Sequence, residues 1–254
     1  MILYFTGTGN SQFVASVLAK ELEDNLISIN EILKENENKW EFYSKTPYVI
    51  VAPIYAWRFP RKIEEFLERA KFTGNQSIYM IGTMGADAGE TGKYCKKISE
   101  KKKMRFMGFQ GICMPNNYFL SSKMPTKEEA IAKIKEELPN IRELGKQIKK
   151  HQPFLQMKDR TIDWILSSVV NWGFSTFMTG NNHFTVDHSC TKCKKCVKEC
   201  PVNNITLYND KIQFKNQCMF CLRCVSLCPV HAIDYKGKSK KNGRYLCDVG
   251  EEIF

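Results

Sequence analysis

Eight of the eleven cysteines lie in two short runs near the C-terminal end of the 254-residue chain. The first run, CTKCKKCVKECPVNNI, begins at Cys190, and the second, CMFCLRCVSLCPVHAI, begins at Cys218. Each reads C-x2-C-x2-C-x3-C-P, and an offset of 28 residues superposes all four cysteines and the proline. The two runs are therefore an internal repeat of thiol groups with the spacing of metal ligands.

Thiols at positions i, i+3 and i+6 can bind three corners of a cubane iron–sulfur cluster from one tight loop, and the fourth corner needs a ligand from elsewhere. The proline after each fourth cysteine fixes φ where the chain departs. The run resembles that of bacterial ferredoxins, in which the fourth cysteine of each run binds the other cluster. That resemblance implies one [4Fe-4S] cluster on Cys190, Cys193, Cys196 and Cys228, and a second on Cys218, Cys221, Cys224 and Cys200.

Two other uses of clustered cysteines fit less well. A zinc site needs four ligands, usually in two separated pairs, so the third cysteine of each run would be surplus. Disulfide frameworks are typical of secreted chains, and the N-terminus has neither the basic segment nor the long apolar segment of a signal peptide. We therefore expect a cytoplasmic protein with two [4Fe-4S] clusters, in which Cys95, Cys113 and Cys247 are free thiols.

A second candidate site lies near the start of the chain, in the segment FTGTGNS at residues 5–11. It is not the dinucleotide fingerprint G-x-G-x-x-G, because Gln12 occupies the third glycine position, and the chain contains no Walker A sequence. Its hydroxyls and backbone N–H groups could instead surround one terminal phosphate at a helix N-terminus. The residues of this predicted phosphate loop are Thr6, Gly7, Thr8, Gly9, Asn10 and Ser11.

The elements that must position this loop alternate along the first 150 residues. Strands are predicted over 2–5, 26–29, 48–52, 77–81 and 106–113, and helices over 11–24, 60–70, 89–102 and from a capping box at Thr126 and Glu129 onward. Pro139 is expected to kink or interrupt the last helix. The alternation predicts an α/β fold with a doubly wound parallel sheet of five strands. Such sheets bind ligands beyond the carboxyl ends of their strands, where the phosphate loop lies.

TGTGNS after an N-terminal strand resembles the FMN phosphate loop of flavodoxins, and the strand layout is similar to theirs. The resemblance implies two flavin loops, PIYAWRFP at 53–60 and GTMGADAG at 82–89. With MPNNY at 114–118 and GRYL at 243–246, the whole chain resembles flavodoxin–ferredoxin fusion proteins of anaerobes. The implied cofactor is FMN, with Tyr55 or Trp57 stacked on the flavin. The other flavin-site residues that it implies are Pro53, Ala56, Thr83, Met84, Gly85, Ala86, Asp87, Asn117 and Tyr118.

The same resemblance divides the chain into an FMN-binding domain at 1–150, a helical linker at 151–186 and a small α+β 2[4Fe-4S] ferredoxin domain at 187–254. Between the cysteine runs, ITLYNDKIQF predicts a hairpin that covers the clusters. The uncharged segment 164–182 is too polar for a membrane span. Its residues Ile165, Val169, Trp172 and Phe177 are expected to pack between the domains, and binding to a membrane surface or to a partner is the alternative.

The formal net charge of +11 comes without a recognition motif, so nucleic-acid binding is disfavoured. Two lysine-rich clusters could each dock an acidic protein; otherwise the first suits a solvated helix face, and the second suits partial neutralisation of the anionic iron–sulfur cluster. They are Lys96, Lys97, Lys101, Lys102, Lys103 and Arg105, and among the cluster ligands Lys192, Lys194, Lys195 and Lys198.

No residue pattern indicates substrate chemistry of the chain's own. We therefore expect an electron carrier that passes low-potential electrons between its clusters, FMN and a redox partner protein. Two other functions stay open at this point. The chain could be a flavin-dependent reductase of a quinone or other small molecule, or a ferredoxin whose first domain only docks partners.

Overall fold

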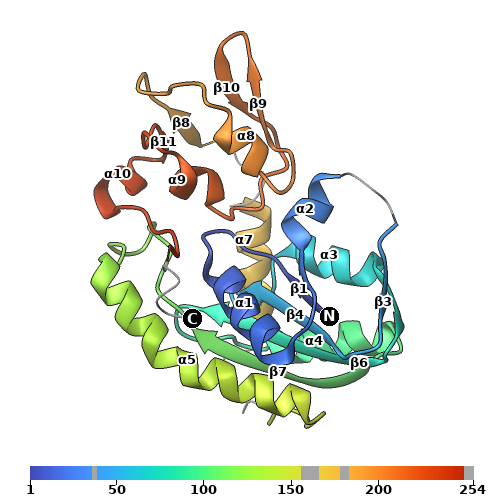
Figure 1. The fold of residues 1–254 in the computed structure, drawn as a ribbon. Coiled ribbons are helices and arrows are strands. Elements are labelled where there is room, and N and C mark those ends of the chain that lie inside the picture. The colour runs from blue at the N-terminus through green and yellow to red at the C-terminus, as the bar shows by residue number, and fades with distance from the viewer. Residues whose placement is uncertain (36–38, 156–165, 178–182, 249–254) are drawn as a thin grey trace.

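The computed structural model in Figure 1 describes residues 1–35, 39–155, 166–177 and 183–248. Residues up to 155 form a layered α/β domain, drawn from blue to yellow-green. Residues 183–244 form a smaller domain, drawn in orange and red, that lies above the first domain in this view.

The first domain is built on a parallel sheet of five strands. In spatial order the strands are β2 (Leu26–Ser28), β1 (Ile2–Tyr4), β4 (Tyr48–Pro53), β6 (Ser77–Met84) and β7 (Arg105–Cys113). Each neighbouring pair is parallel. Every residue of β4 is buried, which is why this central strand reads as an apolar run rather than as an alternation. The predicted five-stranded, doubly wound sheet is confirmed.

Helices cover both faces of the sheet. On one face lie α1 (Asn10–Leu22) and α5 (Lys127–Lys149), and on the other lie α3 (Arg61–Arg69) and α4 (Thr91–Lys101) (Figure 1). Because successive side chains of a strand point to opposite faces, Val49 packs in the core beneath α1 and α5, whereas Ile50 packs in the core beneath α3 and α4. The two cores fix the carboxyl ends of the strands at one edge of the domain.

The long helix α5 begins with the predicted capping box, in which Thr126 and Glu129 each bond the other's backbone N–H. The expected interruption at Pro139 does not occur, because α5 runs unbroken from Lys127 to Lys149. Proline has no N–H, so the carbonyl of Lys135 receives no hydrogen bond from within the helix. Lys135 and Pro139 are both exposed, so water can donate a hydrogen bond to this carbonyl instead. Buried residues on both sides of Pro139, such as Ile134 and Ile141, hold the helix against the sheet.

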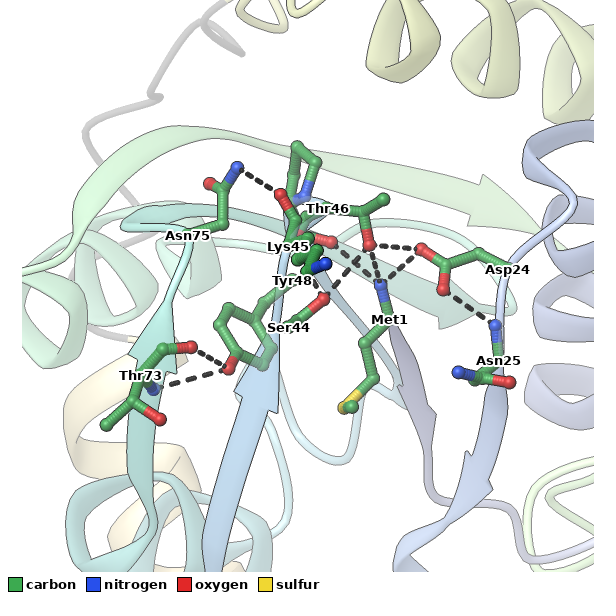
Figure 2. A network of polar contacts seen from close by, with 10 residues as sticks. Met1, Asp24, Asn25, Ser44, Lys45, Thr46, Tyr48, Thr73 and Asn75 are labelled. Carbon is green, nitrogen blue, oxygen red and sulfur yellow. Dashed lines mark hydrogen bonds and ion pairs between the residues drawn. The ribbon is translucent and has the colours of Figure 1, made fainter.

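Three elements of the first domain were not expected from the sequence. They are α2 (Ile29–Lys34) and a separate parallel pair, β3 (Glu41–Ser44) with β5 (Lys71–Gly74). Figure 2 shows a polar network that links the ends of β3 and β5, at Ser44 and Thr73, to the start of the chain at Met1. In it the Met1 amine donates hydrogen bonds to the Asp24 carboxylate and to the Thr46 hydroxyl (2.8 Å).

The second domain contains two small antiparallel sheets and short helices. The hairpin of β9 (Ile205–Tyr208) and β10 (Lys211–Phe214) confirms the prediction, and both residues of its turn, Asn209 and Asp210, have positive φ. The second sheet pairs β8 (Phe184–Val186) with β11 (Ile233–Tyr235). The helices are α8 (Lys195–Glu199), α9 (Arg223–Leu227) and α10 (Lys238–Asn242).

The internal repeat is also present in the backbone. Left-handed residues occur in pairs separated by the same 28 residues, namely Lys192 with Phe220, Lys194 with Leu222 and Asn203 with His231. The helices α8 and α9 have the same offset. The two cysteine runs therefore adopt one local conformation twice.

Between the domains lie a π-helical segment, η1 (Leu166–Val170), and α7 (Asn171–Phe177). Of the residues expected to pack there, Trp172 is 64% exposed, and Ile165 and the side chains of Val169 and Phe177 lie outside the described residues. Other side chains of α7 contact both domains. Asn171 donates to the Tyr55 carbonyl (3.1 Å), and the Phe174 ring contacts that of Phe220.

None of the helices in the described part of the chain combines the length and apolarity needed to cross a membrane.

Candidate functional site

The predicted phosphate loop follows β1 and leads into α1, and all six of its residues are buried. Gly9 precedes α1 with φ 101°, a conformation that favours glycine. Among the described residues, the backbone N–H groups of Thr8, Asn10 and Ser11 have no hydrogen-bond partner. These donors at a helix N-terminus carry the partial positive charge that a phosphate requires.

The hydroxyls of the loop are oriented by internal donors. Thr6 Oγ1 accepts a hydrogen bond from Gly9 N (2.9 Å), and Thr8 Oγ1 accepts one from Asn117 Nδ2 (2.8 Å). An oxygen that accepts in this way keeps its own proton for a further bond. The loop therefore presents backbone and hydroxyl donors together, which fits the terminal phosphate of FMN.

One hollow joins this loop to the ends of three further strands. The predicted site residues that line it are Thr6, Gly7, Thr8, Asn10, Ser11, Pro53, Tyr55, Thr83, Met84, Gly85 and Asn117. Ile54, Pro115 and Asn116 also line it and were not expected, although the last two belong to the quoted segment MPNNY. The predicted residues Gly9, Ala56, Trp57, Ala86, Asp87 and Tyr118 are not part of its wall.

A tight turn accounts for the position of Trp57. Ala56 and Trp57 both have positive φ, and Tyr55 and Arg58 exchange backbone hydrogen bonds across them. The Trp57 side chain lies against Gly89, where an added Cβ would come within 2.8 Å of the Trp57 Cβ. Tyr118 lies elsewhere, with its ring 6.4 Å from that of Phe220 in the second domain.

The end of the described chain covers the phosphate loop. Cys247 N donates to the Thr8 carbonyl (2.7 Å), and the Tyr245 hydroxyl donates to Asn10 Oδ1 (2.7 Å). A Cβ on Gly9 would lie 2.8 Å from the Cys247 Cβ. Sequence reasoning missed this contact, and the only available signal was that GRYL contains Tyr245.

The cysteines of the two runs form two groups. Burial, and next the thiolates of Cys190, Cys228 and Cys193, raise the pKa of Cys196 to about 11. The four cysteines implied as ligands of the first cluster therefore lie near one another, and we call them the outer thiol group. Among the described residues, no three or more His, Cys, Asp or Glu side chains are arranged to hold a single metal ion.

The other four cysteines, Cys218, Cys221, Cys224 and Cys200, form the inner thiol group. Burial, together with the neighbouring thiolates of Cys218 and Cys200, raises the pKa of Cys221 to about 12. Cys224 also lies near Cys196, so the two groups adjoin. Metal binding must overcome these raised pKa values, because thiols bind iron as thiolates.

Backbone N–H groups already point at several of these sulfurs. Asn204 N donates to Cys200 Sγ (3.2 Å), and Ala232 N donates to Cys228 Sγ (3.3 Å), again at an offset of 28 residues. Such bonds orient thiolates toward a cluster and stabilise its negative charge.

The inner thiol group faces the first domain. Met219 belongs to the core beneath α3 and α4, and Arg223 Nη1 donates to the Gly7 carbonyl (3.3 Å). A Cβ placed on Gly7 would lie only 2.3 Å from the Cys221 carbonyl oxygen. The outer thiol group faces away, and its Cys193 is exposed.

The architecture is thus an α/β domain with a phosphate loop, joined to a domain with two groups of four thiols. Comparison with known families makes the assignment specific. Residues 1–124 match the flavodoxin domain family, and residues 184–244 match the 4Fe-4S dicluster domain family. The chain thus has the domain composition of a flavodoxin–ferredoxin fusion, and these domains support electron transfer with a flavin and an iron–sulfur cofactor.

Solved structures with matching regions include flavodoxins. A Streptococcus pneumoniae TIGR4 flavodoxin is 11% identical, with 59% of this chain and 97% of that chain covered at a TM-score of 0.37. The two-electron reduced Megasphaera elsdenii flavodoxin is 15% identical, with 59% and 99% covered at a TM-score of 0.36. No curated protein sequence matches the chain.

Proposed function

We propose that this chain is an electron-transfer protein that holds two [4Fe-4S] clusters and FMN, and that the inner cluster exchanges electrons with the flavin site. The observation that carries this proposal is the contact between Gly7 of the phosphate loop and the backbone of Cys221, an inner thiol ligand. When bound, the clusters supply one-electron transfer and FMN supplies one- or two-electron transfer.

The residues have distinct tasks in this proposal. Cys190, Cys193, Cys196 and Cys228 hold the outer cluster, and Cys218, Cys221, Cys224 and Cys200 hold the inner one. Each run thus completes the site of the other, which makes the two clusters depend on a common fold. The phosphate loop anchors FMN through the N–H groups of Thr8, Asn10 and Ser11 and through the hydroxyls of Thr6 and Thr8. Tyr245 and Cys247 cover that loop and separate it from water.

The outer cluster is the proposed contact point for a redox partner. Its ligand Cys193 is exposed, and Lys192, Lys194, Lys195 and Lys198 around it are exposed as well. Lys192 forms an ion pair with Asp210 (3.1 Å), which leaves a net positive surface. This charge favours an acidic partner protein, because complementary charge speeds encounter.

A second candidate function rests on a cavity of ≈ 390 Å³ next to the inner thiol group. Cys218 lies in its wall together with Phe59, Phe174 and Arg61. Its size and mixed lining suit a small planar acceptor such as a quinone. Turnover of a quinone by the purified protein, without any partner protein, would support this reductase function.

The test of the main proposal is anaerobic reconstitution of the full chain with iron, sulfide and FMN. We expect about eight iron atoms and about one FMN per chain, because each cubane holds four iron atoms. Rapid mixing with dithionite should then show flavin reduction that follows cluster reduction at a rate independent of protein concentration. Binding of iron without FMN would contradict the flavin part of the proposal and leave a ferredoxin whose first domain only docks partners.

A further inference from the structure

The hydroxyl of Tyr55 is a polar group without a partner in the interior. Its oxygen is buried and has no hydrogen-bond partner among the described residues. A buried hydroxyl left without a bond is costly, and native proteins rarely retain one. The position of this hydroxyl therefore indicates what it would bind.

The surroundings of the hydroxyl are the phosphate loop and the inner thiol group. A Cβ on Gly7 would lie 3.0 Å from the Tyr55 hydroxyl and 2.3 Å from the Cys221 carbonyl oxygen, so both atoms lie beside Gly7. Tyr55 and Cys218, an inner thiol, also line one cavity. A phenol hydroxyl can donate its proton to a negatively charged sulfur.

Neighbouring residues hold Tyr55 in this position. Its backbone N donates to the Arg58 carbonyl (2.8 Å), which closes the turn that contains Ala56 and Trp57. Asn171 Nδ2 of α7 donates to the carbonyls of Tyr55 and Ala56 (3.1 and 2.9 Å). The linker helix therefore holds the backbone from which the Tyr55 side chain extends.

We propose that the Tyr55 hydroxyl donates a hydrogen bond to a sulfur of the inner cluster and thereby raises the reduction potential of that cluster. This inference rests on the proposed function, because it requires that the inner thiol group binds a cluster. A donor at a cluster sulfur stabilises the more negative, reduced state. A residue of the first domain then sets the reduction potential of a cluster in the second domain. The higher potential favours the reduced state of the cluster next to the flavin site.

The test uses the reconstituted full-length protein and its Tyr55→Phe variant, which removes one oxygen and keeps the ring. In a redox titration followed by electron paramagnetic resonance, we expect the inner cluster of the variant to have the lower potential. At a fixed potential its reduced-to-oxidised ratio should fall about fivefold to tenfold, the equilibrium effect of one hydrogen bond. The outer cluster should not change.

A second readout does not depend on potentials. After transfer of the protein into D₂O, electron–nuclear double resonance should detect an exchangeable deuteron coupled to the inner cluster in the wild type and not in Tyr55→Phe. Tyr79→Phe is the matched control, because Tyr79 is also buried but donates to the Gln152 carbonyl (3.0 Å). Tyr235→Phe is a second comparison, because the Tyr235 hydroxyl is also without a partner and lies near Cys218.

The outcomes separate this inference from the proposed function. If Tyr55→Phe retains about eight iron atoms and leaves both the potential and the deuteron signal unchanged, the role of Tyr55 is refuted and the two-cluster function stands. If only Tyr235→Phe shifts the inner cluster, Tyr235 is the donor and the inference is wrong. If the wild type assembles no inner cluster, both proposals fail.

Discussion

Gly7 of the phosphate loop lies in van der Waals contact with Cys221, although 213 residues separate them in the sequence. The missing side chain of Gly7 is what allows this approach, because an added Cβ would lie 2.3 Å from the Cys221 carbonyl oxygen. The contact places the backbone of an inner thiol ligand directly on the loop predicted to bind phosphate.

Gly7→Ala should force this contact apart. The obstacle is backbone rather than a flexible side chain, so we expect a loss of about 1–3 kcal/mol of stability, as for overpacked interiors. Denaturant unfolding of the purified chain measures it. Gly173→Ala is the control, because nothing lies within 4 Å of a Cβ there. Equal stabilities of Gly7→Ala and the wild type would show that the domains do not make this contact in solution.

Cys200→Ala should remove the inner cluster although Cys200 belongs to the first run. Iron content is expected to fall from about eight to about four atoms per chain, with only the outer cluster left in the paramagnetic resonance spectrum. Cys228→Ala should have the reverse effect. Cys113→Ala, outside both runs, should retain all the iron. Loss of the outer cluster in Cys200→Ala would show that each run binds its own cluster.

Thr8→Asp should expel FMN from the phosphate loop. A carboxylate at this buried position would repel the phosphate, and we expect affinity for FMN to fall by at least about tenfold. Thr8→Asn, of nearly the same size but uncharged, is the matched control. Fluorescence titration with FMN measures the dissociation constant of each variant. Undiminished binding by Thr8→Asp would place the phosphate elsewhere.

Charge reversal at Lys194 and Lys195 should alter electron transfer at the outer cluster. The double variant to Glu is expected to slow oxidation by ferricyanide, an anion, by about tenfold at low ionic strength, and to speed oxidation by hexaamminecobalt(III), a cation. Both effects should vanish in high salt. The same reversal at Lys96 and Lys97 of α4 is the control. If the reversal at Lys96 and Lys97 changed the oxidation rates more, the small oxidants would receive electrons near α4 rather than at the outer cluster.

The network in Figure 2 predicts a pH dependence of stability. Burial alone would raise the pKa of Asp24, but hydrogen bonds from the Met1 amine, Thr46 and Asn25 outweigh it and lower that pKa. A carboxyl whose pKa is lowered by folding contributes stability above its unfolded pKa, which is lost as pH falls through the folded value.

Asp24→Asn should therefore destabilise the chain by about 0.5–1 kcal/mol at pH 6. The difference from the wild type should shrink as the pH falls below about 4, because Asp24 begins to protonate there in the unfolded chain and protonates in the folded chain only at lower pH. Thermal unfolding at pH 6, 4 and 3 measures the trend. A difference that stays constant over this range would mean that the Asp24 charge does not contribute.

Much of the fold was predictable because its signals are local. The apolar run of β4, the helical spacing of α1 and the capping box at Thr126 each act within one element, and their alternation leads to a parallel sheet. The interruption expected at Pro139 was wrong because its cost depends on whether the residue whose carbonyl loses its donor is buried, and that residue, Lys135, is exposed. The pair of β3 and β5 was missed because each strand is short and amphipathic.

By itself the sequence determined the ligand types and spacing of the two cysteine runs, and the chemistry of the phosphate loop, because these depend on residues only a few positions apart. The tertiary structure decided which thiol group faces the flavin site, that Tyr55 and not Trp57 lines the hollow, and that Cys247 covers Gly9. These are contacts between segments far apart in the chain. They depend on how the helices and strands pack after they have formed. The packing of one domain against another leaves no periodic pattern in the sequence.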